Sequence, residues 1–243
     1  MINILTISKN TVLRNIFGVF LKLLPANIVV SILYGKIRGK KWIKSAGVNA
    51  YCLGTYEIEK QKLFEKIVKP NDIVFDIGAH VGFYTLLASE LVGESGKVFA
   101  FEPLSRNINY LKRHIALNKC NNVFVMEAAV CDKAGEVYFE ELHDSFYGRV
   151  VDEQTDIKVA SIVLDNLLKN DELPAPNVLK IDVEGNELLV LKGAENILQK
   201  YHPVIFLATH SEKIRNDCFN FLENLKYNFK NITDKDISEI FAY

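Results

Sequence analysis

The sequence lacks several features that would each assign it to a class of protein. Its formal net charge is −1 over 243 residues, so no strong positive field recruits nucleic acid. It has no Cys-x-x-Cys pair, and its cysteines are widely spaced: Cys52, Cys120, Cys131 and Cys218. Cys120 and Cys131 lie beside predicted strands, where burial as small hydrophobic side chains is favoured over a disulfide. This pattern indicates a reducing, cytoplasmic setting.

No unbroken apolar run is long enough to cross a bilayer. Residues 12–33 are apolar, but Lys22, Pro25 and Asn27 interrupt them, whereas a spanning helix needs about 20 apolar residues. No small-residue cleavage site of the secretory kind is present. Helical spacing here favours a helix packed on the domain or on a second copy in a homodimer. Weak membrane association is the alternative, supported by the cations within residues 36–44.

From residue 72 onward, short apolar segments alternate with amphipathic ones. Strands are expected at 72–78, 97–103, 122–130, 177–185 and 202–209, with closing strands at 228–233 and 238–243. Strands this apolar are buried on both faces, which predicts an α/β fold with a parallel sheet covered by helices. Residues 131–176 break the alternation and predict an extra hairpin or edge strand and a short helix over the sheet's mouth. With no repeat or linker, one domain with an N-terminal helical or hairpin extension over residues 1–50 is favoured.

The segment FDIGAHVGFYT, residues 75–85, joins the first core strand to its helix. In a doubly wound sheet, ligands bind outside the carboxyl ends of the strands, so this turn is the prime binding site. Gly78 lets the chain turn tightly and lets a ligand approach the backbone. Gly82 begins the helix, where backbone N–H groups point outward.

The same turn distinguishes between nucleotide ligands. Its Gly-x-x-x-Gly spacing differs from the Gly-x-Gly-x-x-Gly of dinucleotide folds. Asp76 would repel a pyrophosphate but suits a cationic amino acid end. Glu102, at the end of the next strand, can accept hydrogen bonds from both hydroxyls of a ribose. A ligand with a ribose, an α-amino group and no phosphate satisfies these constraints, and S-adenosylmethionine is such a ligand.

FDIGAHVGFYT is followed by FAFEP, VMEAAVCDKAGEV, LKIDVEGNELLVLKGAE and PVIFLATH. In order and spacing these motifs resemble the FkbM-type S-adenosylmethionine-dependent methyltransferases, from about residue 51 to about residue 230. The resemblance implies a class I methyltransferase fold over residues 51–243: a Rossmann-like doubly wound sheet, mostly parallel with one antiparallel strand.

The resemblance also implies which residues bind the cofactor: Tyr56, Glu57, Asp76, Gly78, Ala79, His80, Gly82, Thr85, Glu102, Pro103, Glu127, Ala128 and Asp182. The methionine moiety is expected against Asp76, Gly78 and Ala79, with Tyr56 and Glu57 nearby and Thr85 helping to hold the amino acid end. The ribose is expected on Glu102, and the adenine at Glu127 and Ala128. His80 stands where the family usually has asparagine. A histidine keeps one donor and one acceptor, and it would add a pH dependence.

Three residues are candidates for catalysis. Asp182 ends the fourth core strand in KIDVEG and is expected to act as base, orient the substrate or ligate a cation. Glu184 lies either on the same face of a continuing strand or at the start of the next helix as a cap. His210 ends the fifth strand and either accepts a proton or orients the substrate. Lys180 is expected to cover the opposite face. No metal site is indicated, because no third ligand is visible beside Asp182 and Glu184.

The polar loop HDSFYGRV, residues 143–150, is expected to form a lid over the substrate. Phe146 and Tyr147 offer flat apolar surface, and Arg149 offers a bidentate grip on a carboxylate or phosphate. The resemblance implies methyl transfer to a small molecule, with a hydroxyl of a sugar, lipid-like molecule or natural product as the expected acceptor. The alternatives are N-methylation of a small molecule or peptide, a nicotinamide-dependent oxidoreductase, and a non-catalytic S-adenosylmethionine-binding module. A nucleic-acid methyltransferase is disfavoured by the near-neutral charge.

Overall fold

The computed structural model describes residues 25, 27–141, 148–151, 153–234 and 236–243. Most of the predicted N-terminal helix lies outside these ranges, and so do Phe146 and Tyr147 of the predicted lid. Within the described ranges, the structure has no helix that is both long and apolar enough to cross a membrane.

The core of the molecule is a seven-stranded sheet in the order β12-β13-β11-β10-β3-β4-β5. The strands are β3 (Ile73–Ile77), β4 (Lys97–Phe101), β5 (Val123–Met126), β10 (Val178–Ile181), β11 (Val204–Ala208), β12 (Phe229–Thr233) and β13 (Asp236–Ala242). Strand β13 runs antiparallel to both of its neighbours, and the other pairs are parallel. The predicted doubly wound, mostly parallel sheet with one antiparallel strand is therefore confirmed. Most of the strands end earlier than predicted, because residues such as Gly78 and Glu102 lie in the turns that follow.

The strands are held by apolar side chains that alternate between two faces. Paired positions on one face carry Val74, Val98 and Val178. Their neighbours on the other face include Phe75 and Leu179. All five side chains are almost fully buried, and burial of a side chain of this size contributes roughly 1.5–3 kcal/mol.

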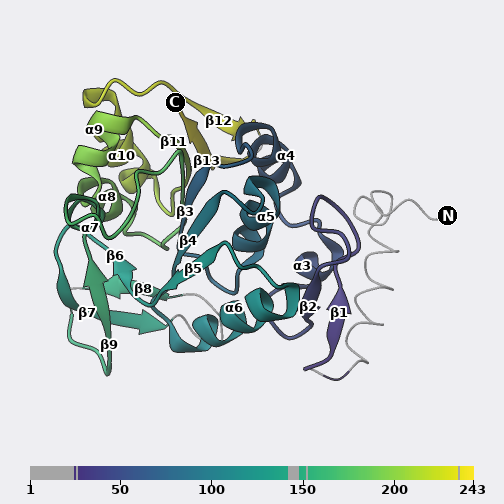
Figure 1. Cartoon of the computed structure of the whole chain (residues 1–243). Helices are drawn as coiled ribbons and strands as arrows, with labels where there is room; N and C mark the ends of the chain where they lie inside the picture. The colour runs from purple at the N-terminus through teal and green to yellow at the C-terminus, as the bar shows by residue number, and fades with distance from the viewer. Residues whose placement is uncertain (1–24, 26, 142–147, 152, 235) are drawn as a thin grey trace.

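Helices cover both faces of the sheet (Figure 1). One side carries α4 (Ile58–Ile67), α5 (Phe83–Val92) and α6 (Ser105–Asn118). The other carries α7 (Leu164–Lys169), α8 (Glu187–Lys192), α9 (Glu195–Tyr201) and α10 (Glu212–Asn224). The helical segment after β10 is divided into α8 and α9. Gly193 lies between them, where a Cβ atom would stand 2.1 Å from the carbonyl oxygen of Cys131.

A second sheet of four strands occupies the region where a hairpin or edge strand was expected. Its strands are β6 (Ala129–Val130), β7 (Gly135–Glu141), β8 (Gly148–Val151) and β9 (Ile157–Ile162), in the order β6-β9-β7-β8. The segment predicted as one strand over 122–130 is broken between β5 and β6, and its second part joins this sheet.

The described part of the N-terminal extension contains an antiparallel pair, β1 (Val29–Ser31) and β2 (Lys41–Ile43), followed by α3 (Asn49–Leu53). Trp42 of β2 is fully buried and stacks on His114 of α6 at 3.8 Å between ring centroids. The imidazole Nε2 accepts a hydrogen bond from the Ile43 amide at 3.0 Å, and Nδ1 lies 2.7 Å from the Val81 carbonyl oxygen. Nδ1 therefore carries the single proton of a neutral ring, and the ring ties the extension to the main domain.

The burial of His114 predicts a specific loss of stability in acid. Burial lowers the pKa of His114 from 6.5 to about 4, so the unfolded chain takes up this proton at a higher pH than the folded chain. Stability is expected to fall as the pH drops from 6.5 to about 4, by on the order of 3 kcal/mol from this group. Urea unfolding of the wild type and of His114→Phe across this range measures the effect, and the variant should show the smaller acid loss. An equal loss in both proteins would contradict the assignment.

Candidate active site

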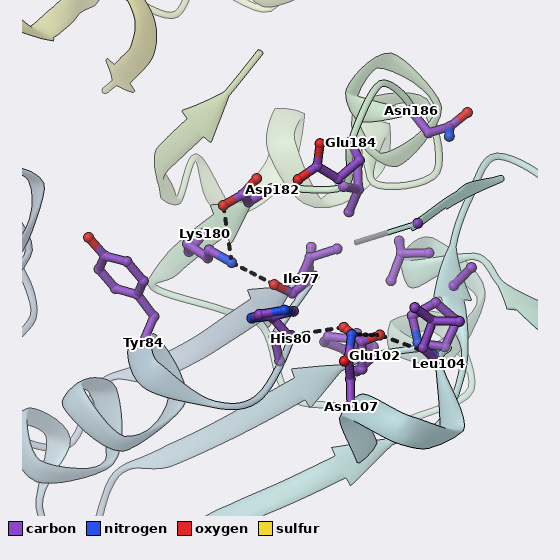
Figure 2. Close-up of a pocket in the computed structure, with 18 of the residues that line it drawn as sticks. Ile77, His80, Tyr84, Glu102, Leu104, Asn107, Lys180, Asp182, Glu184 and Asn186 are labelled. Carbon is purple, nitrogen blue, oxygen red and sulfur yellow. Dashed lines mark hydrogen bonds and ion pairs between the residues drawn. The ribbon is translucent and has the colours of Figure 1, made fainter. Parts of the chain in front are cut away.

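A cavity opens at the carboxyl ends of β3, β4 and β10, where the strand order of the central sheet reverses (Figure 2). The small sheet also contributes to its wall, through Phe139, Gly148 and Val150. The cavity is lined by many of the residues predicted from the sequence: Tyr56, Gly78, Ala79, His80, Glu102, Pro103, Ala128, Asp182 and Glu184. Other predicted residues are absent from the lining: Glu57, Asp76, Gly82, Thr85, Glu127, Arg149 and His210.

Gly78 makes the turn after β3 possible because a residue with a Cβ atom would collide with a neighbouring part of the backbone. Its φ of +74° is a left-handed conformation that favours glycine. A Cβ atom here would stand 1.8 Å from the carbonyl oxygen of Asp182. The sequence suggested that this glycine makes room for a ligand, but the backbone that approaches the Cβ position is the turn after β10. The two turns are therefore fixed against each other.

Lys180 is a buried cation at the junction of these turns. Its Nζ lies 3.1 Å from Asp76 Oδ1 and 3.9 Å from Asp182 Oδ2, and it donates to the Gly78 carbonyl oxygen at 2.7 Å. Burial lowers the pKa of Lys180, but the charges of Asp76 and Asp182 outweigh burial and hold the pKa above its usual value. The prediction that Lys180 faces away from Asp182 is wrong, because residues two apart along a strand share a face. Figure 2 shows the ammonium group turned toward Asp182.

Asp76 lies behind the cavity wall. Its Oδ2 accepts a hydrogen bond from Thr85 Oγ1 at 2.6 Å, its Oδ1 faces Lys180, and only 1% of the residue is exposed. The structure thus differs from the expectation that Asp76 and Thr85 contact the amino acid end of a ligand. The carboxylate that this region presents to the cavity is that of Asp182.

Glu57 belongs to a second buried network beside the cavity. Its carboxylate accepts from Tyr84 Oη at 3.0 Å and pairs with Lys60 Nζ at 3.2 Å. Lys60 also pairs with Glu239 at 2.7 Å. Burial raises the pKa of Glu239 to about 7, although Lys60 opposes that shift. Glu57 therefore holds the wall around Tyr84, and its neighbour Tyr56 faces the cavity.

Glu102 faces the cavity with its carboxylate already oriented. Oε2 accepts from the His80 amide at 2.8 Å, and Oε1 accepts from the Leu104 amide at 3.0 Å and from Asn107 Nδ2 at 3.1 Å. A carboxylate has about four acceptor positions, so the side chain can still accept from a ligand. Burial raises the pKa of Glu102 to about 7, although these hydrogen bonds oppose the shift. Asn107 was not predicted, because a polar residue inside a helix gives no sign that it reaches back to a strand end.

His80 has a left-handed backbone, with φ of +55°. Asparagine and histidine are both enriched in this conformation among non-glycine residues. The departure from the asparagine usual in the resembling family therefore keeps the local backbone geometry. Nδ1 of the ring lies 3.4 Å from Tyr51 Oη, and both residues line the cavity.

Three predicted binding residues have other contacts. Gly82 packs against Leu111 of α6, and a Cβ atom at this position would stand 2.7 Å from Leu111 Cδ1. Glu127, predicted beside the adenine, is 53% exposed and pairs with Lys112. Arg149, predicted to grip the substrate, pairs with Glu140 at 3.1 Å across the small sheet.

Asp182, Glu184 and His210 meet at the edge of the cavity, and we call them the carboxylate–histidine cluster. His210 Nε2 lies 3.5 Å from Asp182 Oδ1 and 3.3 Å from Glu184 Oε2. Glu184 reaches this position because its φ of +54° ends the strand geometry. Neither sequence interpretation of Glu184 fits: β10 has already ended at Ile181, and the cap residue of α8 is Asn186.

The other ring nitrogen of His210 is held by Glu187, a residue that was not predicted from the sequence. Nδ1 lies 2.7 Å from Glu187 Oε1, and the Glu187 side chain is fully buried. Burial lowers the pKa of His210, but Glu187, Asp182 and Glu184 outweigh burial and raise the pKa to about 9. Burial raises the pKa of Asp182, but Lys180, Lys60 and His210 outweigh burial and hold the pKa below its usual value. No local pattern indicated the contact between Glu187 and His210, because the two residues lie 23 positions apart in the sequence.

The comparisons with known proteins point to methyltransferases. The "Methyltransferase FkbM domain" family matches residues 76–232. The chain is 30% identical over 145 residues to the hexuronic acid methyltransferase AglP of Haloferax volcanii, covering 59% of each protein. It is 28% identical over 159 residues to the methyltransferase sdnD of Sordaria araneosa, covering 51% of this chain and 61% of sdnD. The chain thus spans about three fifths of the length of these curated relatives.

Solved structures support the fold. The crystal structure of a methyltransferase FkbM from Methylobacillus flagellatus aligns with a TM-score of 0.53 at 18% identity, covering 96% of this chain and 60% of that chain. Aeropyrum pernix fibrillarin, crystallised with natively bound S-adenosyl-L-methionine, aligns with a TM-score of 0.50 at 14% identity, covering 80% of this chain and 75% of that chain. These structural similarities show that this chain has the class I methyltransferase fold.

The Lys180 ion pairs predict a large cost for removing the ammonium group. Lys180→Met leaves Asp76 buried without its cation, and loss of one partner of a buried pair typically costs ~3–5 kcal/mol. Lys158→Met is the matched control, because its pair with Glu136 is 53% and 73% exposed and should contribute less than about 1 kcal/mol. Urea unfolding measures both variants. The double variant Asp76→Asn/Lys180→Met should recover part of the loss, and equal effects of the two lysine substitutions would contradict the account.

Proposed function

The chain belongs to the FkbM methyltransferase family, and on that premise we propose that it transfers a methyl group from S-adenosylmethionine to a hydroxyl of a sugar-like small molecule. The observation that carries the proposal is the oriented carboxylate of Glu102 in a cavity at the switch point of the sheet. Ligands of doubly wound sheets bind at this point.

The cavity residues fit each part of this cofactor. We assign the ribose to Glu102, whose carboxylate is fixed by three hydrogen bonds and faces the cavity. The adenine belongs against the apolar groups near Pro103, Leu104 and Ala128. The cationic amino acid end belongs near the turn at Gly78, where Asp182 supplies the facing carboxylate.

The reaction is an in-line displacement in which the cofactor supplies an electrophilic methyl group. The acceptor oxygen forms the new bond to carbon as the sulfur–carbon bond breaks, and the hydroxyl proton passes to the carboxylate–histidine cluster. Asp182 and Glu184 line the cavity and accept the hydroxyl's hydrogen bond, and His210 touches both carboxylates and balances their charge. Alignment can supply several kcal/mol of the barrier, and a positioned base adds about 100- to 10,000-fold in rate.

A sugar-like acceptor is supported by the relative and by the cavity wall. AglP is a hexuronic acid methyltransferase. In this chain, Tyr51 and Tyr56 contribute aromatic rings to the cavity lining, and Glu184 and Asn186 contribute polar side chains. Aromatic faces with a few placed polar groups suit a small polar ring.

Replacing Glu102 is expected to weaken cofactor binding. Glu102→Gln removes the charge that strengthens the hydrogen bond to the ribose, a loss of about 1.5–3 kcal/mol, which corresponds to roughly 10- to 100-fold in Kd. Isothermal titration with S-adenosylmethionine measures this change. Glu136→Gln, an exposed carboxylate of the small sheet, is the control and should bind like the wild type. Unchanged affinity in Glu102→Gln, or tight NAD(H) binding instead, would remove the basis of the proposal.

The acceptor is to be found by a transfer assay. The protein is incubated with methyl-labelled S-adenosylmethionine and a metabolite extract of its own host, and the labelled product is identified by mass spectrometry. We expect an O-methylated sugar derivative. Asp182→Asn should lower the rate by about 100- to 10,000-fold. A labelled nitrogen, or label on RNA or protein, would contradict the proposed acceptor.

A further inference from the structure

The carboxylate–histidine cluster brings three metal-binding side chains to one point. One ligand atom from each of Asp182, Glu184 and His210 lies within 4.8 Å of the other two. We propose that these residues form a binding site for a divalent first-row transition metal ion. The sequence predicted no metal site, because no third ligand lies beside Asp182 and Glu184 along the chain. The fold supplies that ligand from the segment after β11, 26 residues after Glu184 in the sequence.

The separations between the ligand atoms suit a small dication. Bonds of about 2.0–2.2 Å place neighbouring ligand atoms roughly 3.0–3.5 Å apart in octahedral or tetrahedral geometry. His210 Nε2 lies 3.5 Å from Asp182 Oδ1 and 3.3 Å from Glu184 Oε2. Both separations from Nε2 fall within this range, and all three ligand atoms lie within 4.8 Å of one another.

Glu187 orients the histidine as outer carboxylates do in metal centres. The Glu187 carboxylate is fully buried and accepts from His210 Nδ1 at 2.7 Å and from the Gly185 amide at 2.9 Å. A bond of this kind fixes the tautomer that leaves Nε2 to coordinate and makes the ring a stronger ligand. This arrangement is a second observation, independent of the two carboxylates, that points to a ligand at Nε2.

The donor set indicates the class of metal. One imidazole nitrogen and two carboxylate oxygens suit Mn²⁺, Co²⁺ or Zn²⁺, whereas Mg²⁺ and Ca²⁺ prefer oxygen ligands alone. Three protein ligands leave positions open for another oxygen. Asp182 and Glu184 also line the cavity, so such a position is accessible to a hydroxyl of the acceptor.

The role of the ion, though not its binding, rests on the proposed function. A hydroxyl bound to a dication loses its proton more readily than a free one. The cluster would then hold the acceptor oxygen and assist its deprotonation at the same place. Glu187 acts as a positioning residue, because it contacts His210 and is not part of the cavity lining.

Titration of the metal-stripped full chain with Mn²⁺ alone tests the site. The electron paramagnetic resonance signal of free Mn²⁺ is expected to disappear up to one equivalent with the wild type. His210→Gln and Asp182→Asn/Glu184→Gln should abolish this binding, and Glu187→Gln should weaken it by roughly 10- to 100-fold. His202→Gln is the matched control for the histidine, because His202 stacks on Tyr227 away from the cluster. Circular dichroism verifies that each variant is folded.

Two results would overturn the metal site. One is the absence of saturable Mn²⁺ binding by the wild type, which would mean that a proton on His210 alone holds the carboxylates. The other is full binding by folded His210→Gln. Titration with S-adenosylmethionine on the same samples separates this inference from the proposed function. His210 lies outside the cavity lining, so His210→Gln should lose Mn²⁺ and keep the cofactor.

Discussion

The buried ammonium group of Lys180 is the constraint on which the site depends. Strands β3 and β10 and the turns after them converge on it, and its Nζ lies close to Asp76, Asp182 and the carbonyl oxygen of Gly78. A buried carboxylate without a partner is strongly disfavoured, so the two acids at the strand tips can be close together only with this cation between them. The close contact of Gly78 with the Asp182 backbone completes the same junction. The contacts of Lys180 and Gly78 therefore set the positions of the turns that follow β3 and β10.

This junction divides the acids of the site into two groups. Asp76 is committed to the protein, since Thr85 and Lys180 hold its two oxygens. Asp182, Glu184 and Glu102 face the cavity and are available to a ligand. Asp76 fixes the geometry of the turns, whereas Asp182, Glu184 and Glu102 present carboxylates to a ligand in the cavity. KIDVEG is a structural and a functional motif at the same time, because its Lys180 pairs with Asp76 and its Asp182 and Glu184 line the cavity.

Much of the fold follows from the sequence, because continuous apolar strands and the glycine turn are local signals. The parallel sheet covered by helices and the binding site at the turn after β3 were predictable in this way. The contacts of Lys180 and Glu187 were not, because they depend on which side chains face each other across neighbouring elements. The four-stranded sheet was underestimated for a similar reason. Ala129–Val130 leaves the central sheet and pairs with Ile157–Ile162, a partner far along the chain.

The most direct test is a crystal structure of the full chain grown with S-adenosylmethionine. The account predicts ribose hydroxyls within hydrogen-bond distance of Glu102 and the sulfonium methyl group directed toward Asp182 and Glu184. Asp76 should remain paired with Lys180. A cofactor bound elsewhere, or an Asp76 carboxylate that has left Lys180 to hold the ligand's amino group, would contradict it.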